Sequence, residues 1–151
     1  MMKKYLGTLV IALFLSVAGF SQSAIGVRGG VFGVDGNAYG GLEVSYTKIG
    51  SMELDLGWTG SDAWKLTFLK QFGLIGNADK FLLYAGLGAG AGAISSQFHA
   101  NVAVDVGISL KLLKFLQLSL DYRPEWAITS NSYNSTSFTW SNIALGVRFA
   151  F

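Results

Sequence analysis

Residues 101–112 read Asn-Val-Ala-Val-Asp-Val-Gly-Ile-Ser-Leu-Lys-Leu, and this stretch decides the fold. Every second residue from Val102 to Leu112 is a large aliphatic residue, whereas the residues between them are small, polar or charged. Because successive side chains of a β-strand point to opposite faces of the sheet, this period of two predicts a strand with one apolar and one polar face. An amphipathic helix would need a period near 3.6, which the stretch lacks.

The same alternation recurs along the chain and is interrupted by clusters of Gly, Asn, Asp and Ser, which favour turns. We place the other strands at about 24–34, 42–47, 52–59, 64–69, 81–94, 116–123 and 143–151. Leu69 is the one residue that spoils the polar face of its strand. Eight strands in 128 residues leave about 16 residues for each strand and its connection, which suits strands of ~10 residues with short turns. The sequence therefore predicts an all-β fold, an eight-stranded antiparallel up-and-down β-barrel.

Composition indicates which face of this barrel points outward. A soluble barrel or sandwich would show the same period, with the apolar face turned inward. Water-facing surfaces are ~25 to 35% charged, whereas the whole chain is 13% charged and the polar faces consist largely of Gly, Ala, Ser, Thr and Asn. Such a face suits the narrow interior of an eight-stranded barrel. We therefore expect a transmembrane barrel, because a sheet spans a bilayer only when it closes on itself.

The first 23 residues have the pattern of a secretory signal peptide. Lys3 and Lys4 precede an apolar run from about Tyr5 to Phe20, and small residues at Ser21 and Ser23 fit a signal-peptidase site. We expect cleavage after Ser23, which divides the chain into a signal peptide at 1–23 and a barrel at 24–151. The alternative is an uncleaved N-terminal anchor helix, although the run is shorter than the ~20 residues that span a membrane. Both interpretations place the rest of the chain outside the cytoplasm.

Charge and cysteine content exclude several classes of function. Without residues 1–23 the chain carries nine basic and nine acidic residues, so no basic surface for nucleic acid is expected. The absence of cysteine excludes disulfides, thiolate metal sites and a lipidated cysteine. No cluster has metal-ligand spacing, and we expect no cofactor. The glycines at every second position from Gly86 to Gly92 belong to a strand, and we expect them to make room for a long neighbouring side chain such as an arginine.

Charged residues on the polar faces form the candidate site. Inside a narrow barrel they must pair, because an isolated buried charge is very costly. We expect an interior ion-pair network that plugs the lumen, and the alternative is a polar path for ions or a small solute. The network comprises Arg28, Glu43, Glu53, Asp55, Lys65, Asp105, Lys111, Asp121, Arg123, Glu125 and Arg148.

The connections carry the remaining expectations. The longest connection is expected at about Pro124–Ser137, on the outside, and a second long one at Gly73–Lys80. Pro124 cannot donate to a strand ladder, so it should mark a strand end or a bulge. His99, the single histidine, falls in an expected external connection without an acidic neighbour in the chain, so we do not expect an enzyme. Aromatic residues fall near the strand ends in two sets, as expected of interfacial girdles. The first set is Trp58, Trp64, Tyr122 and Trp126, and the second is Phe72, Phe81, Phe115, Phe149 and Phe151.

The pattern of the whole stretch 24–151 resembles small outer-membrane β-barrel proteins of the OmpA/OmpX-like, porin-family type. The most specific part is the final stretch, Ile143-Ala-Leu-Gly-Val-Arg-Phe-Ala-Phe151. It looks like the C-terminal signal that the barrel-assembly machinery recognises in that family, which implies that Leu145, Val147, Phe149 and Phe151 are the recognised residues. The resemblance implies residence in the cell outer membrane, with membrane lipid and the assembly machinery as partners.

From these observations we expect a monomeric barrel with a structural or surface-interaction role. One alternative function is a narrow channel or carrier for small or hydrophobic solutes. A second is a lipid-modifying outer-membrane enzyme, for which His99 is the candidate residue.

Overall fold

The computed structural model describes residues 23–34, 37–49, 51–60, 62–130 and 135–151, and the elements found there are all β-strands. Of the predicted signal peptide, 1–23, residues 1–22 lie outside the described residues. Ser23, which we expected to end that segment, is the first residue of a strand and exchanges backbone hydrogen bonds with Phe151. The strands are β1 (Ser23–Val34), β2 (Asn37–Lys48), β3 (Met52–Thr59), β4 (Ala63–Gly76), β5 (Phe81–Ile94), β6 (Gln97–Lys111), β7 (Leu116–Tyr122), β8 (Glu125–Thr129), β9 (Ser135–Thr139) and β10 (Ile143–Ala150).

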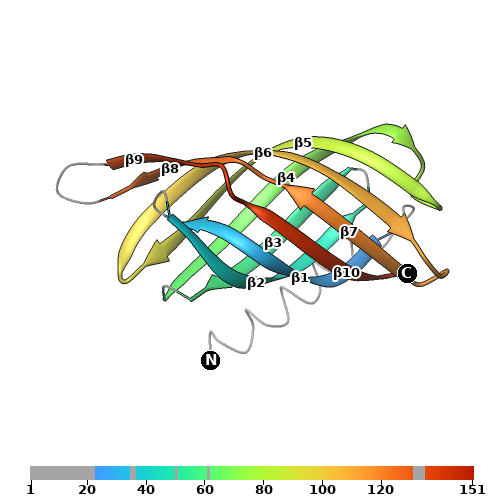
Figure 1. Cartoon of the computed structure of the whole chain (residues 1–151), viewed down its shortest axis with the longest axis horizontal. Helices are drawn as coiled ribbons and strands as arrows, with labels where there is room; N and C mark the ends of the chain where they lie inside the picture. Colours follow the sequence, from blue (N-terminus) through green and yellow to red (C-terminus); the bar gives the residue numbers. More distant parts are fainter. Residues whose placement is uncertain (1–22, 35–36, 50, 61, 131–134) are drawn as a thin grey trace, which may run out of the picture.

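The strands form one antiparallel sheet that closes into a barrel (Figure 1). Closure needs one long-range pairing, between the first strand β1 and the last strand β10, whereas β5 and β6 pair as a hairpin. β7 and β8 follow one another along β6 as a single barrel strand, and β9 and β10 likewise pair with β8 and β7. The result is a closed eight-stranded antiparallel barrel, as predicted.

The barrel has two ends, which we name by what they carry. The terminal rim holds Ser23, Phe151 and the connections β2–β3, β4–β5 and β6–β7. The distal rim holds the connections β3–β4 and β5–β6, and β8 and β9 run toward this side, where β8 ends opposite His99 of β6 (Figure 1).

Both long connections expected from the sequence are wrong. Within Pro124–Ser137 the chain forms β8 and β9, which pair with each other. β9 reads Ser-Thr-Ser-Phe-Thr, so its residues are mostly polar on both faces and lack the alternation that reveals the other strands. Within Gly73–Lys80, β4 continues to Gly76 through an irregularity between Gly73 and Ile75, and the turn that follows begins at a positive φ of 85° at Gly76.

Pro124 interrupts the ladder, as expected. It lies between β7 and β8, and its carbonyl oxygen accepts a hydrogen bond of 3.1 Å from the backbone N–H of Val104 on β6. Because proline has no N–H to donate, the barrel strand is divided at this position.

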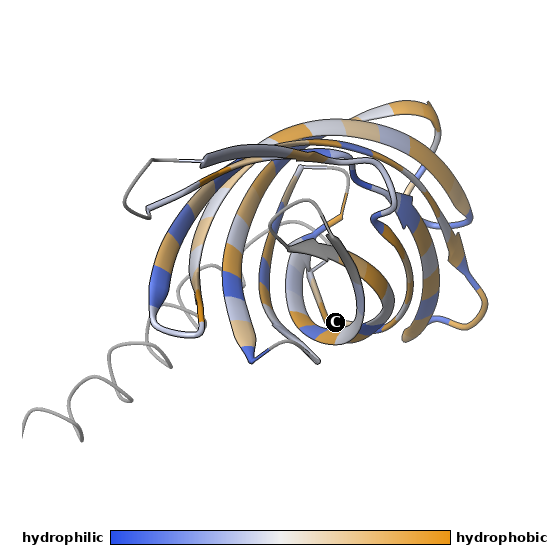
Figure 2. Ribbon diagram, turned by 60° about the vertical axis from the view of Figure 1, so that its left-hand side comes forward, coloured by the Kyte–Doolittle hydropathy of each residue, from blue (hydrophilic) through white to orange (hydrophobic). Residues whose placement is uncertain are grey.

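Burial alternates along the strands in the opposite sense to that of a water-soluble protein. Inward-facing polar side chains are buried, with Asp105 0% and Arg28 1% exposed. Outward-facing aliphatic side chains are open, with Leu87 61% and Val102 60% exposed. Figure 2 shows the matching alternation of hydrophilic and hydrophobic bands along the ribbons. The predicted orientation of the two faces is therefore the one in the structure.

Glycines on the inward face make room for long side chains. A Cβ atom at Gly26 would lie 2.7 Å from Cγ of Arg148, and one at Gly146 would lie 3.0 Å from Cγ of Arg28. The run from Gly86 to Gly92 does the same for Leu69, Gln71, Asn101 and His99 rather than for an arginine, so that detail of the prediction is wrong. Leu69 itself points into the lumen and is fully buried.

We predict that Gly26→Ala destabilises the barrel, whereas Gly40→Ala does not. The added methyl group at position 26 would overlap both Cγ and Cα of Arg148, and overpacking of this kind costs about 1 to 3 kcal/mol. At Gly40 no atom lies within 4 Å of the added carbon, so the change should stay within ~0.5 kcal/mol. Denaturant unfolding followed by tryptophan fluorescence measures both. Equal midpoints for the two variants would contradict the packing described here.

Candidate functional site

The candidate site is a cluster of charged side chains in the middle of the lumen. Three guanidinium groups and five carboxyl groups converge there because each occupies an inward position of its strand. All eight residues are buried, at 3% exposure or less. We call them the central cluster: Arg28 on β1, Glu43 on β2, Glu53 and Asp55 on β3, Asp105 on β6, Asp121 on β7, Arg123 directly after β7, and Arg148 on β10.

Glu53 is the carboxylate that contacts all three arginines of the central cluster. Its Oε2 lies 2.5 Å from Nη2 of Arg148, and its Oε1 lies 3.1 Å from Nη2 of Arg123. Nη1 of Arg28 is 3.6 Å from the same Oε1. Glu53 therefore joins β1, β10 and the β7–β8 junction to β3 across the lumen.

Arg28 and Arg123 share a second carboxylate, Asp55. Its Oδ2 lies 3.2 Å from Nη1 of Arg28 and 2.8 Å from Nη1 of Arg123. Arg28 also pairs with Glu43 and, at 3.0 Å, with Asp121. Charge-assisted contacts of this kind are stronger than those between neutral groups, so the arginines link opposite walls of the barrel.

Asp105 completes the cluster on the β6 side. Its Oδ1 lies 3.7 Å from Nε of Arg123, and its Oδ2 accepts a hydrogen bond of 2.9 Å from Nε2 of Gln71. The same amide donates to Oε2 of Glu53 at 3.3 Å. Gln71 thus bridges two carboxylates that carry charge of the same sign.

Tyr84, like Gln71, is a neutral residue beside the central cluster that sequence reasoning did not select. Its hydroxyl donates to Oδ1 of Asp121, and its ring occupies the space at Gly107, where an added Cβ would lie 2.6 Å from Cζ. The sequence does predict that Gln71 and Tyr84 face inward, because both follow the alternation of their strands. An uncharged side chain does not by itself indicate a role in an ion-pair network.

Two of the predicted network residues lie in a separate group nearer the distal rim. Nζ of Lys65 lies 2.7 and 2.8 Å from the two carboxylate oxygens of Glu125. Nδ2 of Asn101 donates to the same carboxylate at 3.0 Å.

The structure does not bring Lys111 into either group. It pairs at 3.6 Å with Asp79, whose side chain is 70% exposed in the β4–β5 connection at the terminal rim. Its position at the end of β6, rather than its parity, keeps it out of the network.

The described interior cavities beside the cluster are too small for a solute. The space lined by Arg28, Arg123 and Asn142 has a volume near 0 Å³, and the one lined by Glu43, Lys65 and His99 about 10 Å³. A single water molecule needs roughly 10 to 15 Å³. Side chains therefore fill the lumen at these levels.

His99 does not lie in an external connection, so that expectation is wrong. It is an inward-facing residue of β6, 3% exposed, opposite Gly92 on β5 and Thr129 on β8. Among the residues that the structure describes, no group of three or more histidine and acidic side chains is arranged to hold a metal ion.

The outer surface carries aromatic residues at both ends. Toward the distal rim, Trp58, Trp64, Trp126 and Trp140 are between 46% and 70% exposed, and Phe138 stacks between the last two with ring centroids 4.3 Å from each. Toward the terminal rim the exposed aromatic residues are Phe72, Phe81, Phe115, Phe149 and Phe151. Tyr122, expected with the tryptophans, is 38% exposed at the end of β7.

The residues of the expected assembly signal share the outward face of β10. Leu145, Val147 and Phe149 are exposed there, and Phe151 follows the strand with 66% exposure. They lie beside β1 and β7, which flank β10 in the closed sheet.

Comparison with known proteins gives no relative. No protein-family model matches the sequence, and no curated protein matches it either. Within the described residues, none of the elements is a helix long and apolar enough to cross a membrane.

We predict that Glu53→Gln strongly destabilises the barrel. Loss of this carboxylate charge leaves Arg148 without its ion-pair partner and weakens the pairs of Arg28 and Arg123, and breaking a buried pair costs about 3 to 5 kcal/mol. Lys111→Gln is the matched control, because its pair with an exposed carboxylate should contribute less than ~1 kcal/mol. Denaturant unfolding of the two variants under identical conditions compares these values, and a Glu53→Gln variant as stable as the control would show that the cluster does not hold the barrel together.

Proposed function

We propose that this chain is an integral outer-membrane β-barrel protein with a structural or surface-interaction role, its interior plugged by side chains and ion pairs. One observation carries the proposal: the outward face is almost entirely apolar and exposed all round the barrel, whereas most charged strand residues are buried inside. Soluble monomers rarely expose contiguous apolar patches larger than a few hundred Å². In a bilayer the same surface contacts acyl chains, and the closed sheet satisfies the backbone.

The aromatic residues at the two rims support the same proposal. Tryptophan and tyrosine concentrate at membrane–water interfaces, and transmembrane barrels carry girdles on both sides of an apolar band about 25 Å tall. The four exposed tryptophans near the distal rim and the phenylalanines near the terminal rim bracket the aliphatic surface in this way.

The rims suggest an orientation in the membrane. Barrels of this kind have short periplasmic turns and longer external loops. The longest connection between two strands, the five residues from β8 to β9, joins strand ends on the distal side. We therefore assign the distal rim to the outside and the terminal rim, which holds Ser23 and Phe151, to the periplasmic side. The outward residues Leu145, Val147, Phe149 and Phe151 remain our candidates for recognition by the assembly machinery, on the resemblance noted above.

The filled lumen favours an anchor over a channel or a carrier. The cavities beside the central cluster hold at most about one water molecule, and Arg28 and Arg123, which cross the lumen, are each held by several carboxylates. A lipid-modifying activity at His99 is also disfavoured, because a side chain buried in the lumen cannot reach a lipid outside the barrel. The proposed function is therefore physical: a monomeric barrel that holds β8, β9 and the distal connections at the cell surface.

Gel migration and solubility test membrane residence and barrel formation together. We expect the processed protein to need detergent for extraction, to run as a compact monomer without heating, and to shift to a slower band after boiling, because the closed barrel resists the detergent at room temperature. A processed protein that stays in solution as a monomer without detergent would overturn the proposal.

We predict that Val104→Arg destabilises the barrel in lipid. Val104 faces outward near the middle of β6, opposite Leu87, and an arginine on the lipid face costs about 2 to 4 kcal/mol at the bilayer midplane. Val104→Leu keeps the apolar face and serves as the control. Unfolding from lipid vesicles measures both, and an arginine variant as stable as the leucine variant would show that this face does not contact acyl chains.

A further inference from the structure

Charge is almost absent from the outward face of the barrel, with one local exception. In the described part of the chain, the outward-facing strand residues that carry charge are Lys48 on β2 and Lys70 on β4. Both lie directly opposite Met52 of β3, one on each side of it, so they share one row of the sheet. Two strand spacings of ~4.8 Å place their Cα atoms about 10 Å apart. Two cationic side chains thus lie about 10 Å apart on a surface that is otherwise apolar.

Among the residues that the structure describes, no carboxylate pairs with either lysine. Every ion pair found among the described residues lies in the lumen or joins Lys111 to Asp79. Nζ of Lys70 instead approaches Oγ of Ser51, at 3.4 Å, and the face of the Phe72 ring, 5.8 Å from its centroid. Like charges on one face of a sheet repel, and an ammonium group at an apolar surface is costly without a counter-ion.

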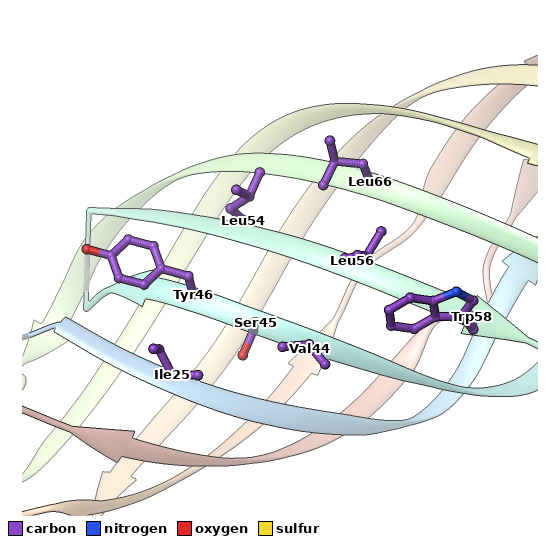
Figure 3. A pocket seen from close by; sticks show the side chains of 8 residues that line it. All are labelled: Ile25, Val44, Ser45, Tyr46, Leu54, Leu56, Trp58 and Leu66. Atoms are coloured by element: carbon purple, nitrogen blue, oxygen red, sulfur yellow. The ribbon is translucent and has the colours of Figure 1, made fainter. Parts of the chain in front are cut away.

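An apolar groove begins next to the two lysines. It has a volume of about 470 Å³ and lies across β1 to β4, lined by aliphatic and aromatic side chains except for Ser45 and the hydroxyl of Tyr46 (Figure 3). Tyr46 and Leu54 are one row beyond the lysines, and Trp58 is at the far end. Trp58 is six positions after Met52, which is about 20 Å along an extended strand. Small-molecule sites have volumes of roughly 300 to 1,000 Å³.

The position of the lysines fits the level of lipid headgroups. At the terminal rim β2 ends at Lys48 and β3 begins at Met52. The next hairpin is longer, because β4 runs on to Gly76 and β5 begins at Phe81. The wall of the barrel is therefore recessed beside the β2–β3 connection at the terminal rim. Long lysine side chains there can hold their ammonium groups at the membrane surface while their stems cover apolar atoms.

We propose that Lys48, Lys70 and Ser51 bind the phosphate group of an anionic phospholipid, with one acyl chain lying in the groove toward Trp58. The proposal rests on membrane residence as proposed above, and it commits to a phospholipid of the leaflet at the terminal rim. The two ammonium groups match one phosphate and a net negative headgroup, and the groove matches an extended hydrocarbon chain. Shape and charge together select an anionic lipid over a zwitterionic one with the same chains.

Quenching of Trp58 by brominated lipid tests this site. The protein carries Trp64→Phe, Trp126→Phe and Trp140→Phe, so that Trp58 alone reports, and it is inserted into phosphatidylcholine vesicles. Phosphatidylglycerol or phosphatidylcholine, brominated near the end of one acyl chain, is then added in increasing mole fraction. We expect half-maximal quenching at a several-fold lower fraction of phosphatidylglycerol, since each lysine near the surface should contribute about fivefold.

Lys48→Gln and Lys70→Gln should each remove most of this preference, and 1 M salt should remove it from the unchanged protein. Lys114→Gln is the matched control, because Lys114 is exposed in the β6–β7 connection at the same rim but away from the groove. Equal quenching by the two lipids, or an equal loss in the Lys114→Gln variant, would overturn the site. Protection of Trp58 from both lipids would overturn it too, since another occupant, such as a second copy, would then cover the groove.

Heat-dependent migration of the same samples separates this outcome from failure of the proposed function. If the variants and the parent all show the compact unheated band in vesicles while the lipid preference is absent, the barrel is a membrane protein without this lipid site. If the compact band is absent, membrane residence itself fails.

Discussion

The closed sheet imposes the constraint on which the rest of this structure depends. Alternation sends every second side chain into a lumen that eight strands leave barely wide enough to fill, so each inward residue must fit both the space and the polarity of its neighbours. Each large arginine is matched by a glycine on the neighbouring strand. The aliphatic stem of Arg148 lies over Gly26 and that of Arg28 over Gly146, where no side chain competes for the space. The charged heads then meet in the centre, where carboxylates from β2, β3, β6 and β7 surround them.

Buried ion pairs are often no more stabilising than well-packed apolar residues, so the central cluster needs a reason beyond stability. The apolar outer face supplies one. If the interior were apolar as well, both faces of each strand would be alike, and a slip of one residue, which exchanges the faces, would cost little. With Arg28 and Glu53 inside, the same slip would place charges on the apolar wall and break contacts to several strands. The cluster thus specifies register and direction, and Gln71 and Tyr84 strengthen that specificity by donating hydrogen bonds to the carboxylates of Glu53, Asp105 and Asp121.

The sequence was sufficient to predict the fold class, the number of barrel strands and the inward position of the charged residues, because all three follow from a period of two. The sequence was insufficient wherever the alternation of apolar and polar residues is absent or does not determine the position of a residue. β9 has mostly polar residues on both faces, so its serines and threonines are typical of a loop. The small and polar residues around His99 likewise favour a connection, although His99 lies in β6. Lys111 has the right parity but lies too near the terminal rim, since depth along the barrel depends on strand tilt and on where each hairpin turns. Pairing partners are likewise a property of the closed sheet, which is why no local pattern could have joined Glu53 to Arg148 across the lumen.

The inner and outer faces obey the same electrostatic rule, and the contrast between them makes the two outward lysines informative. Inside, Arg28, Arg123 and Arg148 each have carboxylates within ion-pair distance, because a low-dielectric lumen offers no other source of compensating charge. Outside, Lys48 and Lys70 flank Met52 in one row of the sheet, and neither pairs with a described carboxylate. If hydrocarbon were the only surroundings of this face, replacing either lysine with an aliphatic residue would stabilise the protein. In the membrane setting that we propose, the compensating charge comes from lipid headgroups, which carry negative charge at the membrane surface.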